Sequence, residues 1–413
     1  MSVLLIWAIC AVATACVILR PLGWPEWIWA VVGATLLVAT GRVPVGAAIG
    51  AIGRGGDVYL FLAGMMLLSE AARAQGLFDW VAACAARLAG GSRPRLFTLV
   101  FGTGAIVTVL MSNDATAVVL TPAVFAAARH AEADALPLLL ACALIANAAS
   151  FVLPISNPAN LVMYGGHMPP LGAWLDSFTL PSLAAIGATY AVLRLLYRRR
   201  IGGRCTVPEE TPRLSRGGVM ALVGIGLTAL LLVVISALDR PLGAPTALAG
   251  TLTALGVCAL TRNSPLRLVR SVSWGLLPLV AGLFVLVEAL KLTGVTGHMA
   301  DLLRTPMADP RQQAALAGSV LALACNLVNN LPAGLVASSA IAQAQPPDTI
   351  VDALLIGVDL GPNLSVTGSL ATILWLQAIR REGEAVGFWT FLRCGAVAMP
   401  TALAAALAAR LIP

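Results

Sequence analysis

The stretch LAGMMLLSEAARAQGLFDW, residues 62–80, returns later in the chain as VAGLFVLVEALKLTGVTGH, residues 280–298. The matched pairs lie 218 residues apart and are Gly64 with Gly282, Glu70 with Glu288, Ala71 with Ala289 and Gly76 with Gly294. Two apolar helices can share Ala, Gly and Leu by chance. Several matches in one order and with one offset indicate instead that the chain contains an internal duplication.

The composition around these stretches is that of a membrane protein. Of the 413 residues, 59% are hydrophobic and only 11% are charged, with a mean hydropathy of +0.90. Apolar runs long enough to cross a bilayer recur from one end of the chain to the other, so we expect a polytopic protein without an extramembrane domain. The net charge of +7 comes from arginines in short loops, where they indicate topology rather than a nucleic-acid partner.

The duplication extends over the whole chain. To within a few residues, the same offset lays residues 27–42 over 246–262 and carries Ser-Asn-Asp at 112–114 onto Val-Asn-Asn at 328–330. Each half is predicted to contain three helices, a hairpin interrupted by polar residues, a helix broken by Pro and Asn, and a last helix. The predicted units are an N-terminal repeat, 1–197, with hairpin 97–128 and broken helix 136–164; a cytoplasmic linker, 198–216; and a C-terminal repeat, 217–413, with hairpin 313–344 and broken helix 350–378.

The predicted fold class is an all-α polytopic membrane protein made of two inverted-topology repeats. If each hairpin is re-entrant, leaving the membrane on the side where it entered, each half has about five transmembrane helices, and this odd number inverts the second half. With the arginine-rich linker in the cytoplasm, most other arginines also fall on the cytoplasmic side, as the positive-inside rule requires. This topology places both termini outside.

Polar residues interrupt both hairpins and both broken helices. At membrane depth such groups are tolerated only where they are buried in protein or line a wet cavity, so the four interruptions predict one binding site. In a minority interpretation, the asparagines merely bridge helices. The candidate substrate-binding residues are Ser112, Asn113, Ser156, Asn157, Asn160, Asn326, Asn329, Asn330, Asn363, Ser365 and Thr367.

Two carboxylates stand among these residues. Asp114 is the first choice for a proton-coupling group and Asp359 the second, because burial favours the neutral, protonated form of a carboxyl group. Glu70 and Glu288 could form a proton relay, although the basic residues three positions later, Arg73 and Lys291, favour ion pairs.

Two further side chains have a possible function beside an ordinary structural role. Cys325 beside the second hairpin's asparagines could ligate a metalloid, although a lone cysteine is more often a packing residue. His167 could sense pH, although GGHMPPLG is typical of an exposed turn.

The segments SNDATAVVLTPAV, VNNLPAGLV and GVDLGPNLSVTGSLATILW resemble the arsenical pump membrane protein family, the ArsB-type arsenite permeases of the ion transporter superfamily. That family's hallmarks match Asn113–Asp114, Asn329–Asn330 and 359–375 here. The resemblance implies export of arsenite and antimonite as neutral hydroxides in exchange for protons, across the plasma (inner) membrane. It also implies a transport unit that moves against a scaffold, in members that are often dimeric, and in some members a docked cytosolic ATPase.

The residue chemistry agrees with a neutral substrate. The chain has one lysine, Lys291, and no arginine inside the four interrupted elements, whereas a dicarboxylate site needs positive compensation. A trihydroxide can instead be bound through hydrogen bonds to Asn, Ser, Thr and free backbone carbonyls. A sodium-coupled antiporter or carboxylate carrier of the same superfamily remains the alternative, since these groups also suit sodium. The chain has no nucleophile elbow, zinc-protease motif or Walker A sequence, so we expect a secondary transporter without a cofactor rather than an enzyme.

Overall fold

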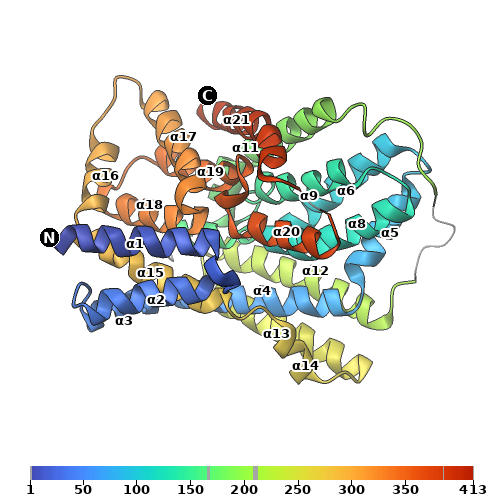
Figure 1. Ribbon diagram of the computed structural model, residues 1–413, viewed down its shortest axis with the longest axis horizontal. Coiled ribbons are helices and arrows are strands. Elements are labelled where there is room, and N and C mark those ends of the chain that lie inside the picture. Colours follow the sequence, from blue (N-terminus) through green and yellow to red (C-terminus); the bar gives the residue numbers. More distant parts are fainter. Residues whose placement is uncertain (1, 165–167, 208–212, 385, 413) are drawn as a thin grey trace.

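The computed structural model describes residues 2–164, 168–207, 213–384 and 386–412, so His167 and part of the linker lie outside the described residues. The described residues are mostly helical, with one isolated antiparallel bridge between Ser92 and Arg204 and no named strand. This confirms the predicted all-α class. Figure 1 shows most helices running along the long axis of the molecule.

The helices of the first repeat follow the predicted order and include short ones that were not predicted. They are α1 (Ser2–Leu19), η1 (Pro21–Gly23), α2 (Glu26–Ala39), α3 (Val45–Arg54), α4 (Gly56–Ala74), α5 (Leu77–Leu88), α6 (Arg93–Leu110), α7 (Asn113–Ala115), the π-helix η2 (Thr116–Leu120), α8 (Thr121–His130), α9 (Ala135–Ala148), η3 (Pro154–Ser156), α10 (Pro158–Tyr164) and α11 (Leu171–Leu196). The predicted hairpin is formed by α6 to α8, and the predicted broken helix by α9 and α10.

The second repeat has the same order. Its helices are α12 (Arg216–Ala237), α13 (Gly243–Thr261), α14 (Pro265–Ser271), α15 (Leu276–Leu292), α16 (Val295–Arg304), α17 (Pro310–Val328), α18 (Asn330–Ala344), α19 (Asp348–Leu360), η4 (Gly361–Asn363), η5 (Val366–Gly368), α20 (Leu370–Arg381) and α21 (Phe388–Leu411). Here α17 and α18 form the hairpin, and α19 and α20 form the broken helix. In Figure 1 α17 and α18 lie toward one end of the long axis and α6 and α8 toward the other, as inverted repeats require.

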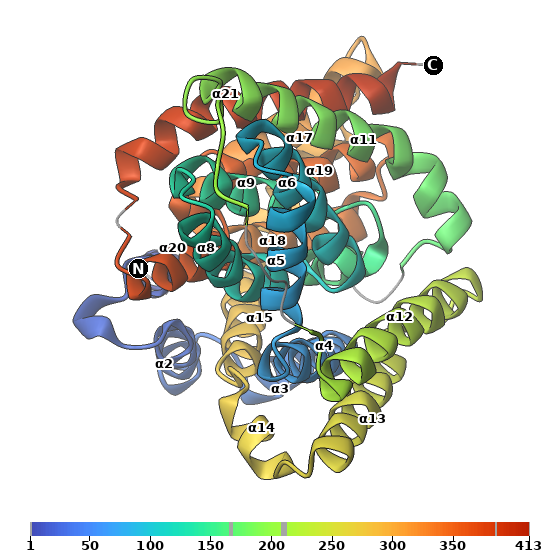
Figure 2. The ribbon, with the colours of Figure 1, turned by 90° about the vertical axis from the view of Figure 1, so that its right-hand side faces the viewer.

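The matched glycines of the two repeats bring helices of opposite repeats close together. α4 packs against α13, and α15 packs against α2. A Cβ atom on Gly64 would lie 2.2 Å from the Thr246 carbonyl oxygen, and one on Gly282 would lie 2.8 Å from the Ala30 carbonyl carbon. Small residues at these crossings therefore allow the close backbone approach that is typical of membrane helices. Figure 2 shows these helices, α2–α4 and α12–α15, on one side of the hairpins and broken helices.

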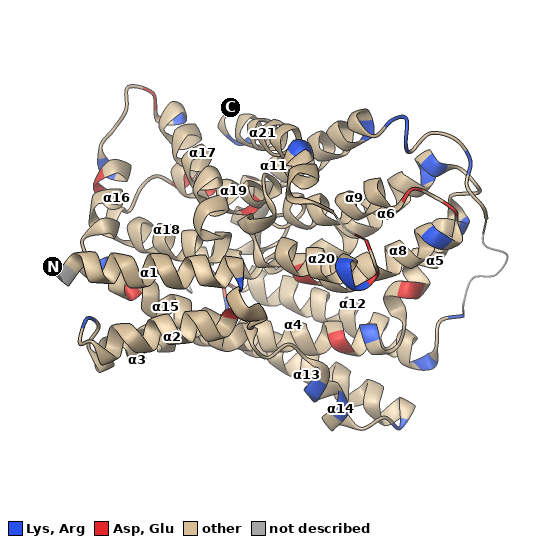
Figure 3. Ribbon diagram, in the orientation of Figure 1, with Lys and Arg blue, Asp and Glu red and all other residues tan. Residues whose placement is uncertain are grey.

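Both repeats contain helices that could span a membrane. Within the described residues, five helices are long and apolar enough to span a membrane: α6, α11, α12, α13 and α21. The number rises to seven if α3 with α4, bent by 49°, and α14 with α15, bent by 42°, each form one span. In Figure 3 the basic residues gather at the end of the long axis where α5 and α8 lie and the linker crosses. This clustering agrees with the predicted cytoplasmic side.

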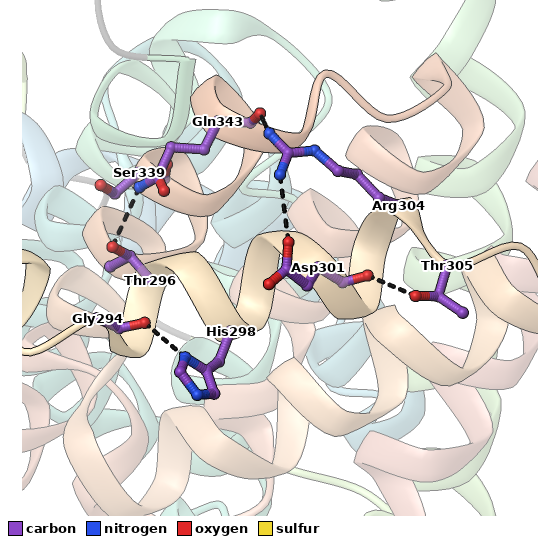
Figure 4. A network of polar contacts seen from close by, with 8 residues as sticks. All are labelled: Gly294, Thr296, His298, Asp301, Arg304, Thr305, Ser339 and Gln343. Carbon is purple, nitrogen blue, oxygen red and sulfur yellow. Dashed lines mark hydrogen bonds and ion pairs between the residues drawn. The ribbon is translucent and has the colours of Figure 1, made fainter.

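The unpredicted helices α5 and α16 are matched, and each packs against the second arm of its own repeat's hairpin. At α16 the contact is polar (Figure 4). Gln343 of α18 donates to the Thr296 hydroxyl at 3.1 Å. Arg304 of α16 donates to the Gln343 carbonyl and lies 3.2 Å from Asp301. α16 therefore holds the C-terminal end of the hairpin in place.

Candidate functional site

The tips of the two hairpins have unusual backbone conformations. Ser112, between α6 and α7, has φ 149°, and Asn329, between α17 and α18, has φ 74°. A positive φ in a residue other than glycine is strained, and such strain is concentrated at functional sites. When the two hairpins are aligned at their breaks, Ser112 corresponds to Asn329 and Asn113 to Asn330. This alignment differs by one residue from the one predicted from the sequence. The reason is that the helix resumes directly after the strained residue in both hairpins, at Asn113 and at Asn330.

A cavity of about 380 Å³ lies between the two hairpin tips. Both hairpins and both broken helices contribute to its wall, which confirms that the four interrupted elements converge. Its polar lining includes the predicted residues Ser112, Asn113, Asp114, Asn157 and Asn330, together with Ser369. The cavity extends to Arg20, Glu26 and Arg381, which all lie on the predicted cytoplasmic side.

Three of the side chains that line the cavity carry polar groups that the protein itself does not use. Among the described residues, the Asp114 side chain forms no hydrogen bond and no ion pair. The Asn113 side-chain oxygen is buried without a partner, and no side-chain hydrogen bond joins Asn330 to the described residues. Because buried polar groups are normally satisfied, these free groups have the character of a binding surface for a small polar solute.

Other predicted binding residues form hydrogen bonds within the protein instead. Asn326 joins the second hairpin to the break between α19 and α20, because its Oδ1 accepts from the Ser365 hydroxyl at 2.8 Å and its Nδ2 donates to the Gly361 carbonyl at 3.0 Å. The Thr367 hydroxyl donates to the Asn326 carbonyl at 3.0 Å, and Asn329 Nδ2 donates to the Thr367 carbonyl at 3.3 Å. None of these four side chains lines the cavity.

The same holds for two residues of the first broken helix. The Ser156 hydroxyl donates to the Val109 carbonyl of the first hairpin at 3.1 Å, and Asn160 Nδ2 donates to the Ser150 carbonyl at 2.9 Å. These bonds satisfy carbonyls that the helix break leaves without helical partners. Both side chains are fully buried and lie off the cavity wall.

Asn363 and Asp359 lie deeper in the protein. Asn363 accepts a hydrogen bond from Asn147 of α9 at 3.0 Å and donates to the Leu144 carbonyl at 3.0 Å. Asp359 is fully buried and accepts a hydrogen bond from Asn157, which itself lines the cavity. Asn147 was not among the predicted site residues, because a single amide within an apolar helix is a weak signal in the sequence.

The two matched glutamates form the ion pairs that their spacing predicted. Glu70 binds Arg73 through contacts of 2.5 and 2.8 Å. Glu288 lies 3.7 Å from Lys291 and also binds Arg54 of α3. Of the two, only Glu70 lines the cavity.

Cys325 is fully buried and does not line the cavity. Its Sγ lies 4.0 Å from the Val358 carbonyl oxygen. This position is typical of a packing residue.

The family model described as CitMHS, citrate transporter, matches residues 3–359. The chain belongs to the CitMHS family. Its curated relatives include the arsenical pump membrane proteins of Yersinia enterocolitica and of Escherichia coli K12, each 28% identical over 365 residues and covering 83% of this chain and 82% of the relative. An uncharacterized transporter of Mycobacterium tuberculosis, Rv2684, is 28% identical over 372 residues, covering 86% of this chain and 84% of the relative.

Solved structures share the fold of this CitMHS-family chain. The YdaH transporter of Alcanivorax borkumensis aligns with a TM-score of 0.59 at 15% identity, covering 88% of this chain and 86% of that one. MtrF of Neisseria gonorrhoeae aligns with a TM-score of 0.52 at 14% identity, covering 92% of this chain and 84% of that one. As a member of the CitMHS family, the chain is a polytopic membrane transporter of the ion transporter superfamily, not an enzyme.

Proposed function

We propose that this transporter exports arsenite and antimonite as neutral hydroxides across the plasma (inner) membrane, in exchange for protons. The observation that supports this most strongly is that Asn113 and Asn330, whose side chains are free to bind a solute, line the same cavity as Asp114, a carboxylate with no basic partner among the described residues. The arsenical pump membrane proteins among its relatives point to the same class of solute.

The side chains of Asn113, Asp114 and Asn330 in the cavity wall favour a neutral solute over an anion. Arsenite and antimonite, as trihydroxides, present hydroxyl groups that both donate and accept hydrogen bonds, and amides offer both kinds of partner. An anion placed beside Asp114 would meet a like charge at short range without compensation from a cation. Two arginines also line the cavity: Arg20, which is partly exposed and paired with Glu26 at 2.5 Å, and Arg381, which is exposed.

Exchange follows if solute and proton compete for Asp114. An ionised carboxylate accepts hydrogen bonds from the solute hydroxyls, whereas a protonated one offers fewer acceptors and binds the solute more weakly. A carrier that moves outward with solute bound to ionised Asp114, and inward with Asp114 protonated, couples the flux of solute to the flux of protons. The proton gradient then drives export, because it determines which form of the carrier faces each side.

A carboxylate carrier or a sodium-coupled antiporter is the second candidate. The description of the matching family model, citrate transporter, favours it, and so do Arg20 and Arg381 in the cavity wall. Under this alternative an anion would bind near these two arginines. Asp114 would then either not contact the anion or bind a cation.

Transport into inverted membrane vesicles separates the two candidates. Vesicles from cells that express the chain should accumulate arsenite when their interior is made acidic, and a host without its own exporter should gain arsenite and antimonite resistance. Citrate or sodium should not compete for this uptake. Sodium-dependent citrate uptake without arsenite accumulation, from well-expressed protein, would overturn the proposal.

A further inference from the structure

The short helix α14 and the residues before it carry charge of one sign. Arg262, Arg267 and Arg270 are all exposed, and the chain has no Asp or Glu between Asp239 and Glu288. Figure 3 shows basic residues where α13 meets α14, without acidic ones beside them. Within the described residues, none of the three arginines forms an ion pair or a side-chain hydrogen bond. Their charges are therefore available to a partner outside the chain.

The matched helix of the other repeat lacks these charges. α3 and α14 each form the first part of a bent helix pair, and Figure 1 shows them toward opposite ends of the long axis. At the offset of 218 residues, Arg267 corresponds to Ile49 and Arg270 to Ile52, and both isoleucines are exposed. The one basic residue of α3, Arg54, is bound by α15. This difference matches the asymmetry of the membrane, because the cytoplasmic leaflet carries the anionic lipids.

α14 also presents apolar side chains. Leu266 is 56% exposed and Val269 is 39% exposed, whereas Leu268 is buried where α14 packs against α4 and α13. Trp274, which follows the helix, donates from its indole nitrogen to the Val269 carbonyl at 2.7 Å. Arginines beside exposed aliphatic side chains, with a tryptophan at one end, are typical of a helix that lies in the headgroup region of a membrane.

The joint between α14 and α15, residues 271–275, forms part of the wall of the solute cavity. Ser271, Val272, Ser273 and Gly275 all line this cavity. Gly275 packs closely on Trp27 of α2, since a Cβ atom on it would lie 2.5 Å from the indole Cδ1. A partner that holds α14 in place therefore also holds this part of the cavity wall.

We propose that α14 binds the headgroups of anionic phospholipids in the cytoplasmic leaflet, through Arg262, Arg267 and Arg270, and that this contact anchors the joint between α14 and α15. Arginine forms strong, paired hydrogen bonds with phosphate groups. The exposed Leu266 and Val269 would contact the acyl chains. A membrane surface is favoured over an acidic protein, because α14 lies between two segments that are long and apolar enough to span the membrane. This inference does not rest on the proposed arsenite transport.

The test uses the purified full-length protein in mixed micelles that contain phosphatidylglycerol or phosphatidylcholine with the same acyl chains. Native mass spectrometry counts the lipids that stay bound, and thermal unfolding measures stability. The wild type should retain more phosphatidylglycerol than phosphatidylcholine and should unfold at a higher temperature with it, because a ligand of the folded state stabilises that state. Arg267→Gln/Arg270→Gln should weaken phosphatidylglycerol binding by about tenfold or more and lose most of the rise in the midpoint.

Arg240→Gln/Arg311→Gln is the matched control, because it removes two exposed arginines on the predicted outer side and should respond to phosphatidylglycerol as the wild type does. Soluble glycerol phosphate distinguishes a lipid surface from a simple phosphate site, and it should neither displace the lipid nor raise the midpoint. Equal retention of the two lipids by the wild type would overturn the proposal. So would equal responses of the α14 variant and the control, or a stabilisation by glycerol phosphate that equals that of the lipid.

Discussion

Asn113 and Asn330 are equivalent residues of the two repeats: each begins the second arm of its hairpin, directly after a residue with positive φ, and both line the same cavity. An inverted duplication brings the two hairpin tips face to face from opposite ends of the molecule. The site is therefore formed by both repeats together.

The first prediction concerns these two amides. Asn113→Ala and Asn330→Ala should each weaken arsenite binding by about five- to tenfold, because each removes hydrogen bonds worth roughly 1 kcal/mol. The measurement is the arsenite concentration that half-saturates uptake into inverted vesicles. Asn263→Ala, at an exposed asparagine after α13, is the matched control and should leave it unchanged. If both cavity variants have wild-type half-saturation, the amides do not bind the solute.

Asn326 should behave differently, although it lies only four residues from Asn330. Its side chain joins the second hairpin to the break after α19, so Asn326→Ala should destabilise the protein by about 2 kcal/mol and leave buried groups without partners. The measurement is the unfolding midpoint, taken together with the half-saturating arsenite concentration of the folded fraction. Weaker binding at wild-type stability would place Asn326 in the binding site.

The close helix crossing at Gly64 gives a stability prediction. Gly64→Ala would place a methyl group 2.2 Å from the Thr246 carbonyl, and the overpacking should cost about 1 to 3 kcal/mol. Gly102→Ala is the control, because a Cβ atom there meets no atom within 4 Å and alanine favours a helix. Thermal unfolding of both variants in the same detergent makes the comparison. Equal midpoints would show that α4 and α13 do not approach this closely.

Cys325 should be dispensable for transport. Its thiol is fully buried and does not line the cavity, so Cys325→Ser should keep most arsenite export in resistance and vesicle assays. Complete loss of export from a variant with normal folding would make the thiol a metalloid ligand.

The architecture was largely predictable because its signals are local. Polar interruptions in apolar runs indicate the hairpins, and Pro with Asn indicates the broken helices. The helices α5 and α16 were missed because they are short and carry charged residues such as Asp79 and Asp301, so neither looks like a membrane span. Their position becomes clear only from the hairpin arms that they pack against.

The site was predictable as a region but not residue by residue. The same amide can bind a solute or satisfy a broken backbone, and sequence does not distinguish the two roles. Asn330 lines the cavity, whereas Asn326, four residues earlier on the other arm of the hairpin, is already hydrogen-bonded to Gly361 and Ser365. Asn147 was not predicted because the helix that carries it is otherwise apolar and is unbroken up to Ala148.

The most direct test of the proposed mechanism is arsenite accumulation by Asp114→Asn in inverted vesicles with an acidic interior. The amide keeps the size of the side chain and an acceptor oxygen but cannot take up or release a proton. We expect binding to purified protein to survive and arsenite to equilibrate down its own gradient, while accumulation driven by the proton gradient is lost. Asp114→Glu keeps the carboxyl group and should retain part of the proton-driven accumulation. Accumulation at the wild-type rate and extent by Asp114→Asn would contradict the coupling role of this carboxylate.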